Sequence, residues 1–315
     1  VDYDGTASSL LVEPERTNVF IQNDISTWNG FSSYADETTA PDGTTIDFVN
    51  MEDRRIFPTT TISNSTEYTS SIYLKGNKTA DVKLRNTAAN DTVITLSTEW
   101  QRFELTATSV STVTNALLID ARYSQGMGAA GLEIAIYGGQ VEVGSYPTSY
   151  IPTDGGTVTR VQDQYSKSGI SNLINSTEGV LFVEMAAFAD DGGYRYISLS
   201  DGTTSNFIVI RYYNVLSKVS AFLYNASGVQ GSTSAVVSDI TQLTKVAFKW
   251  KDSDFALWVN GVEAATGTGS TFSSGALNTL NFDNGIGGNP FFGKVKQLQV
   301  YDTSLSDTQL ATLTT

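Results

Sequence analysis

The sequence predicts an all-β protein built from two tandem β-sandwich (jelly-roll) domains, with a short C-terminal helix. Thr, Ser, Gly, Asn and Val are abundant, and Leu-rich helical stretches are scarce. Near the middle, residues Gln140–Thr153 combine two Pro with Gly and Ser, which excludes a helix and predicts an ordered connector. A chain of 315 residues has room for two domains. We therefore expect domains at 1–155 and 156–315.

In the first half, short segments of alternating polarity lie between turn signals. Ser70–Lys75 and Asp81–Arg85, separated by Gly76–Thr79, have the pattern of a β-hairpin. The period of two predicts a shared buried face of Ile72, Leu74, Val82 and Leu84. It predicts a shared outer face of Ser71, Tyr73, Lys75, Asp81, Lys83 and Arg85. Further strands are expected at Gln101–Ala107, Ala116–Tyr123 and Leu132–Tyr137.

The second half also consists of short segments of alternating polarity between turn signals, but its sequence does not repeat that of the first half. Asn260-Gly261 is a strong type I′ turn signal. Ser306 followed by Gln309 predicts a capping box that opens one short terminal helix. The expected strands are Gly179–Ala187, Arg195–Ser200, Asn206–Tyr213, Lys218–Tyr224, Thr244–Lys251, Asp254–Val259 and Lys294–Tyr301.

Composition excludes several classes of function. With no His and no Cys, the chain has no imidazole or thiolate for a catalytic triad, a thiol nucleophile or a zinc site. A formal net charge of −14 disfavours nucleic acid as a partner. No apolar stretch approaches the roughly 20 residues that span a bilayer, so we expect no membrane insertion. The chain begins with Val, and we expect it to be a mature or excised part of a longer protein.

Several stretches of the first half resemble a module common in phage tail and prophage proteins. The matching stretches are Asp2–Thr6, Ser9–Asn18, Ala40–Thr44, Ser71–Gly76, Glu99–Arg102 and Gln140–Thr153. This module is similar to the jelly-roll carbohydrate-binding modules of the family 4/9 and galactose-binding-like type. The resemblance implies a glycan-binding role, with an extracellular or virion-surface location and other virion proteins as further partners.

The second half resembles a laminin-G or concanavalin-A-like domain. The stretches that carry the resemblance are Gly179–Glu184, Ile197–Gly202, Phe255–Gly261, Gly293–Tyr301 and Leu305–Leu313. It implies a second β-sandwich of lectin type. Ligand identity does not follow from it, because these folds carry many specificities.

Binding of a sugar requires an aromatic surface for the C–H face of the ring and polar groups for its hydroxyls. In the first half, Tyr73, Lys83, Arg85 and Tyr137 have this mixture, although an ordinary solvated sheet face has it too. Trp28 and Tyr34 lie in a turn-rich stretch and are either a binding platform or a plug at the end of the sandwich. In the second half, the candidates are Tyr194, Tyr196 and Tyr213, which fit a lectin-like groove or the margin of a β core.

Acidic turns give candidate ligands for a structural Ca²⁺, since oxygen-rich loops hold this ion. The residues are Asp190, Asp191, Asp201 and Asp283. No EF-hand spacing is present, and Asp-Gly also forms ordinary turns.

Two hypotheses for function follow. The first is a non-catalytic protein that binds a polysaccharide or cell-surface glycan, as part of a phage tail or receptor-binding apparatus. The second is a structural spacer or decoration module without glycan binding. An enzyme is disfavoured, because the closest carboxylate pair, Glu184 and Asp190, lacks the Glu-x-Asp-x-Glu spacing of glucanases with a similar fold.

Overall fold

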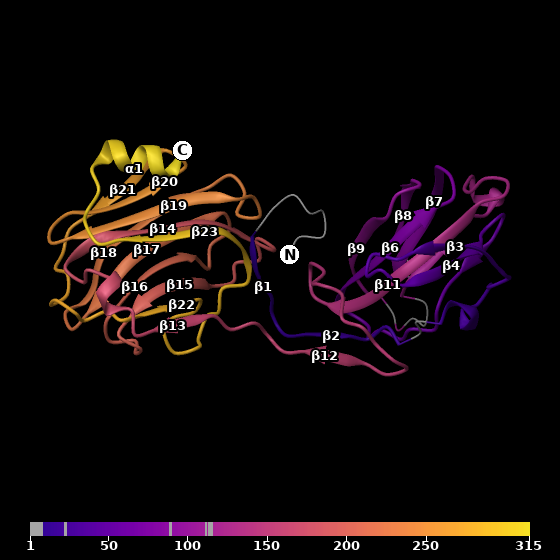
Figure 1. Cartoon of the computed structure of the whole chain (residues 1–315), viewed down its shortest axis with the longest axis horizontal. Helices are drawn as coiled ribbons and strands as arrows, with labels where there is room; N and C mark the ends of the chain where they lie inside the picture. The colour runs from indigo at the N-terminus through magenta and orange to yellow at the C-terminus, as the bar shows by residue number, and fades with distance from the viewer. Residues whose placement is uncertain (1–8, 22–23, 88–89, 111, 113–115) are drawn as a thin grey trace. The chain divides into compact units, whose positions relative to one another are not determined.

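The structure is a computed structural model that describes residues 9–21, 24–87, 90–110, 112 and 116–315. It contains two compact units (Figure 1). The N-terminal unit is Glu15–Val161, and the C-terminal unit is Gln162–Thr315 together with the described residues before Glu15. The Asp2–Thr6 stretch lies outside the described residues. None of the described helices is long and apolar enough to cross a bilayer.

The N-terminal unit is a sandwich of two antiparallel sheets. The five-stranded sheet has the order β3 (Tyr34–Thr39), β4 (Thr45–Asn50), β11 (Glu133–Val143), β6 (Glu67–Gly76), β9 (Gln101–Thr108). The four-stranded sheet has the order β5 (Arg55–Ile56), β10 (Leu118–Asp120), β7 (Ala80–Thr87), β8 (Asn90–Leu96). A separate pair joins β2 (Arg16–Asn18) to β12 (Val158–Arg160).

The expected hairpin of the first half is wrong in its pairing. The residues predicted to be buried, Ile72, Leu74, Val82 and Leu84, do lie in one hydrophobic core. However, β6 pairs with β11 and β9, whereas β7 pairs with β8 and β10. Two strands that face each other across a sandwich bury the same alternate residues as two strands that pair side by side, and the period alone does not distinguish them.

Four buried polar side chains lie where β11 ends: Asn18, Gln140, Glu142 and Thr148, here called the buried polar cluster. The Asn18 side chain accepts from the backbone N–H of Phe20 and Val141 at 3.0 Å each and donates to the carbonyl of Ile151 at 2.9 Å. This cluster holds residues 144–153, the return loop, against the sheet.

Within the cluster, every carboxylate oxygen has a donor. Gln140 Nε2 donates to Glu142 Oε2 at 2.6 Å, and Thr148 N donates to the same oxygen at 3.0 Å. Thr148 Oγ1 donates to Glu142 Oε1. Gln140 Oε1 accepts from Ile151 N at 2.6 Å. Burying a carboxylate is costly unless it is hydrogen-bonded in this way, so the loop and the sheet stabilise one another.

The C-terminal unit is also a sandwich, with two six-stranded sheets (Figure 1). One has the order β1 (Leu10–Val12), β23 (Gly293–Tyr301), β14 (Glu178–Ala187), β19 (Thr244–Lys251), β20 (Phe255–Val259), β21 (Val262–Gly267). The other has the order β13 (Ser166–Ser168), β22 (Thr279–Asn281), β15 (Arg195–Ser200), β16 (Phe207–Tyr212), β17 (Lys218–Asn225), β18 (Gly228–Val236). The main core lies between them.

The terminal helix α1 (Asp307–Thr314) covers the outer face of the first of these sheets. Its Leu310 is fully buried and belongs to a small hydrophobic cluster with Phe182 and Trp258. The predicted capping box is confirmed: Ser306 Oγ accepts from Gln309 N, and the Gln309 side chain accepts from Ser306 N at 2.9 Å. Local sequence thus sets where the helix begins, and the apolar face of the sheet holds it.

The all-β fold class is confirmed, as are the expected strands of the second half within one or two residues. The type I′ signal is borne out as well, with Asn260 at φ 47° and Gly261 at φ 82°. Two features differ from the expectation. The first four residues of the expected connector, Gln140–Val143, continue β11. In addition, β1 pairs with β23, so the described residues before Glu15 belong to the C-terminal unit, whereas the expected domains were the consecutive ranges 1–155 and 156–315.

Replacing Asn18 by Ala should destabilise the N-terminal unit. The change leaves the N–H groups of Phe20 and Val141 buried without their acceptor, at a cost of about 1–3 kcal/mol for each unsatisfied group. We expect a lower urea midpoint for the transition of this unit. Asn64→Ala is the matched control, since Asn64 is exposed. Equal midpoints for the two variants would show that the cluster does not hold the fold.

Replacing Leu310 by Ala should destabilise the C-terminal unit by about 2–5 kcal/mol, the usual range for a fully buried Leu. The loss arises from a cavity between α1 and the sheet. Thr312→Ala, on the exposed side of the same helix, is the control. Thermal unfolding of both variants checks the expectation, and a loss below about 0.5 kcal/mol for Leu310→Ala would contradict this docking of α1.

Candidate functional site

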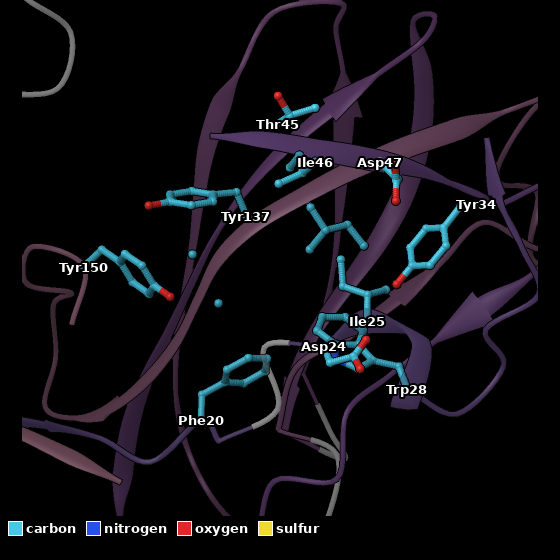
Figure 2. Close-up of a pocket in the computed structure, with 13 residues that line it drawn as sticks. Phe20, Asp24, Ile25, Trp28, Tyr34, Thr45, Ile46, Asp47, Tyr137 and Tyr150 are labelled. Carbon is cyan, nitrogen blue, oxygen red and sulfur yellow. The ribbon is translucent and has the colours of Figure 1, made fainter. Parts of the chain in front are cut away.

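The N-terminal unit contains a pocket of about 370 Å³ beside the start of β4 and the middle of β11 (Figure 2). Its wall is largely aromatic, with two carboxylates among the lining side chains. The aromatic residues are Phe20, Trp28, Tyr34, Tyr137 and Tyr150, and the acidic residues are Asp24 and Asp47. Figure 2 shows Tyr137 and Tyr150 on one side of the opening and Tyr34 with Asp24 on the other.

Two consecutive glycines give the pocket its shape. The pairing of β11 with β6 shifts register between Tyr137 and Gln140, which marks a β-bulge at Gly138 and Gly139. Gly138 has φ 63°, a backbone conformation that residues with a side chain rarely adopt. A Cβ on Gly139 would lie 2.8 Å from the ring of Phe20. Gly139 therefore allows Phe20 to pack directly against the strand at the base of the pocket.

Three tyrosines form a row from the sheet to the return loop. The ring centroids of Tyr73 and Tyr137 lie 6.0 Å apart, and those of Tyr137 and Tyr150 lie 5.5 Å apart. Tyr73 is only 5% exposed, and the guanidinium of Arg102 lies 5.5 Å from its ring centroid. Tyr73 therefore supports Tyr137 from behind, while Tyr137 and Tyr150 are half-buried and reach the pocket.

Trp28 and Tyr34 both line the pocket but differ in exposure. Trp28 is 4% exposed, packs edge-on against Phe20 with centroids 5.8 Å apart, and belongs to the core. It follows the short 3₁₀ turn of Ile25–Thr27, which Asp24 caps. Tyr34, in contrast, is 46% exposed at the rim. Of this predicted pair, only Tyr34 offers a broad surface to a ligand.

The carboxylate of Asp24 has a pKa below its ordinary value. The main cause is the hydrogen bonds that it accepts from Ser26 Oγ at 2.6 Å and Ser26 N at 2.9 Å, and Tyr34 contributes less. Burial raises the pKa of Tyr150, and the nearby charge of Asp42 acts in the same direction. At neutral pH the pocket therefore presents an ionised carboxylate at Asp24 and a neutral phenol at Tyr150.

Lys83 and Arg85 do not share a face with Tyr73, because their strand, β7, belongs to the opposite sheet. Arg85 forms a two-pronged ion pair with Asp91, with Nη2–Oδ2 at 2.8 Å. Lys83 Nζ donates to Gln125 Oε1 at 3.3 Å. The predicted four-residue face is thus divided, and Tyr137 joins the pocket without its expected cationic neighbours.

In the C-terminal unit, the structure brings Tyr194, Tyr196 and Tyr213 together on the outer face of the sheet that contains β15, β16 and β17. The centroid of Tyr194 lies 5.9 Å from that of Tyr196 and 5.4 Å from that of Tyr213. The guanidinium of Arg211 lies among these rings, 4.4 Å from the Tyr213 centroid. The three rings lie together, and their binding of a ligand stays a prediction.

The four candidate calcium ligands make hydrogen bonds within their own turns and to neighbouring segments. Asp190 accepts from Ser217 N and Oγ, both at 2.8 Å, and Asp191 pairs with Arg195 at 2.7 Å. Asp201 accepts from Thr203 N at 2.8 Å, and Asp283 accepts from Gly285 N at 2.6 Å. Within the described ranges, no group of three acidic side chains is arranged to hold a metal ion.

Sequence reasoning missed Phe20, Asp24, Asp47 and Tyr150 as pocket residues. Tyr150 lies between two Pro in the expected connector, and this rigid setting can be read from the sequence. The contact of Tyr150 with Tyr137 cannot. The remaining three belong to segments with no local signal for a pocket. Only the bulge in β11 and the return loop bring them together.

Residues 180–311 match the family model of the concanavalin A-like lectin/glucanases superfamily. The chain matches none of the curated proteins with which it was compared. Among solved structures, it is similar to the CBM40 of the Ruminococcus gnavus IT-sialidase, bound to α2,3-sialyllactose. That match has 18% identity and a TM-score of 0.39, covering 48% of this chain and 98% of the other.

Two further structures extend the comparison. Domain 4 of an extracellular GH43 arabinanase from Geobacillus stearothermophilus, in complex with arabinotriose, has 14% identity and a TM-score of 0.40, covering 51% of this chain and 77% of the other. Domains LG4-5 of the mouse laminin α1 chain have 11% identity and a TM-score of 0.33, covering 81% and 90%. The family match thus makes residues 180–311 of the C-terminal unit similar to the concanavalin A-like lectin/glucanases superfamily.

Proposed function

We propose that this chain is a non-catalytic carbohydrate-binding protein and that the pocket of the N-terminal unit binds a saccharide. The observation that carries the proposal is the aromatic pocket with Tyr137 and Tyr150 on one side and the carboxylates Asp24 and Asp47 in its lining. A volume of about 370 Å³ is within the usual range of small-molecule sites, roughly 300–1,000 Å³.

The chemistry of the lining fits a sugar. The faces of tyrosine rings pack against the apolar C–H side of a pyranose or furanose, and the phenol hydroxyls exchange hydrogen bonds with sugar hydroxyls. An ionised carboxylate such as Asp24 accepts strong, charge-assisted hydrogen bonds from hydroxyl groups. Ring contacts with Tyr73 and Tyr150 hold Tyr137 in place before the ligand arrives, which lowers the entropic cost of binding.

The charge state of the pocket supports binding rather than hydrolysis. A glycoside hydrolase needs one carboxyl group with a raised pKa to protonate the leaving oxygen. The pKa of Asp24 is lowered by Ser26, which is opposite to that requirement. In the C-terminal unit, Glu184 is buried and ion-paired with Lys296 at 3.1 Å, an arrangement that suits a structural role.

The biological setting is part of the same proposal. The resemblance of the N-terminal half to modules of phage tail and prophage proteins supports a tail or receptor-binding component, at a virion surface or outside the cell. There the ligand would be a surface glycan, and other virion proteins would be partners. Several copies on one particle would raise avidity through effective concentration. The competing role is a spacer that binds no glycan.

Tyr150→Ala should weaken saccharide binding about tenfold, because it removes a ring that contacts the sugar and leaves the sheet intact. Tyr137→Ala should have a similar or larger effect. The control is Tyr123→Ala, an exposed tyrosine outside the pocket. The measurement is calorimetric titration of the whole chain with neutral oligosaccharides found by screening dextran, galactan, arabinan and β-glucan.

Two results would overturn the proposal. Absence of binding to every glycan in the screen would favour the spacer role. Release of reducing ends from a bound polysaccharide, lost in Asp47→Asn, would establish an enzyme. Binding that weakens in the two pocket variants, and not in Tyr123→Ala, would locate the site in the pocket.

A further inference from the structure

Two cations on the outer face of the sheet that contains β15, β16 and β17 have no carboxylate partner among the described residues. Arg211 lies on β16 and Lys218 begins β17, and neither forms an ion pair with any described residue. The carboxylate of Asp190 accepts hydrogen bonds from Ser217, the residue before Lys218, and forms no ion pair with Lys218 among the described residues. In a protein of net charge −14, two neighbouring cations without a counter-charge are unexpected.

The sheet register places these groups together and away from the core. Tyr196 pairs with Arg211, and Arg211 pairs with Ser220, so the three form one row across β15, β16 and β17. The residues directly beside them in sequence, such as Ile197 and Ile210, face the other side of the sheet and lie in the main core. The next row contains Tyr213 and Lys218, whose backbones are joined by a 3.1 Å hydrogen bond from Tyr213 N to Lys218 O.

Aromatic rings and two hydrogen bonds fix the guanidinium of Arg211. It lies 5.3 Å from the centroid of Tyr194 and 4.7 Å from that of Phe222, in addition to its 4.4 Å contact with Tyr213. Its Nε donates to Ser220 Oγ at 2.9 Å, and its Nη1 donates to the Tyr196 hydroxyl. The structure shows no partner for Nη2 among the described residues, so part of the fork of N–H donors stays available.

Lys218 approaches the same aromatic group, with Nζ 5.6 Å from the centroid of Tyr213. A guanidinium held in a fixed orientation matches the two oxygens of a carboxylate or sulfate, and an adjacent ammonium adds a second positive charge. The half-buried rings of Tyr194 and Tyr213 beside these cations supply the flat apolar surface that a sugar ring requires.

We propose that Arg211 and Lys218 form a binding site for the carboxylate or sulfate group of an acidic saccharide, with Tyr194 and Tyr213 packing against the sugar ring. This site belongs to the unit whose residues match the lectin/glucanase model, and it is separate from the pocket of the N-terminal unit. The overall negative charge repels polyanions in general, so binding of an acidic glycan must come from a local site of this kind.

The test is calorimetric titration of the whole chain at about 0.15 M salt with three polymers. Polygalacturonate carries carboxylates, dextran sulfate carries sulfates, and dextran is neutral. We expect binding to one or both acidic polymers. Arg211→Gln and Lys218→Gln should each weaken it at least about tenfold, the loss expected when a charge-assisted hydrogen bond is removed. Lys83→Gln, a cation of the other unit, is the control and should leave the affinity unchanged.

Each outcome decides the matter. Loss in both variants with Lys83→Gln unaffected supports the site, and the polymer that binds identifies its anion. If Arg211→Gln does not fold, the half-buried Lys218 still provides the test through Lys218→Gln. Absence of binding to both acidic polymers, equal loss in Lys83→Gln, or retention of affinity in Lys218→Gln would overturn the proposal. Tyr150→Ala separates the two sites, since it should affect neutral glycans only.

Discussion

The buried polar cluster of Asn18, Gln140, Glu142 and Thr148 is the constraint on which the N-terminal unit most depends. Return loops of this length normally lie on the surface, where water satisfies their backbone groups. Here Thr148, Ile151 and Thr153 of the loop are buried, away from that water. The side chains of Asn18 and Gln140 replace it, by bonding to Phe20, Val141 and Ile151. Such fully satisfied networks rigidify the segments that they join.

The pocket follows from this constraint. With Ile151 and Thr148 held to the cluster, Tyr150 is fixed against Tyr137. The bulge at Gly138 and Gly139 directly follows Tyr137, which pairs in register with Tyr73, and Gly139 leaves room for the ring of Phe20. A polar network whose four side chains are not part of the pocket lining thus sets the positions of the aromatic walls, through bonds to Phe20 and Ile151. The part of the aromatic surface formed by Tyr137 and Tyr150 is therefore held in place by contacts within the protein.

The two units use their sheet faces differently. In the N-terminal unit, the return loop covers Tyr73 and leaves a compact pocket with negative charge. In the C-terminal unit, the strands β15, β16 and β17 carry an open aromatic face with two cations. One chain therefore presents two aromatic surfaces of opposite charge. Sites of this kind are suited to different sugars, neutral at the pocket and acidic at the cationic face.

The sequence by itself determined the all-β class, most strand positions, the turn at Asn260-Gly261 and the capped terminal helix. These features depend on local patterns: a period of two, positive φ at a turn, and a Ser and Gln three residues apart. It also indicated the cluster of Tyr194, Tyr196 and Tyr213, because neighbouring strands in one sheet place such residues side by side.

Only the tertiary structure decided which strands pair and which faces oppose each other. Alternation shows that Tyr73 and Arg85 both point away from the core, but not that they lie on opposite sides of the sandwich. Likewise, no local pattern places β1 beside β23 or Tyr150 beside Tyr137. These contacts join residues far apart in the chain, and their free energy comes from burial and hydrogen bonding that exist only once the sheets have formed.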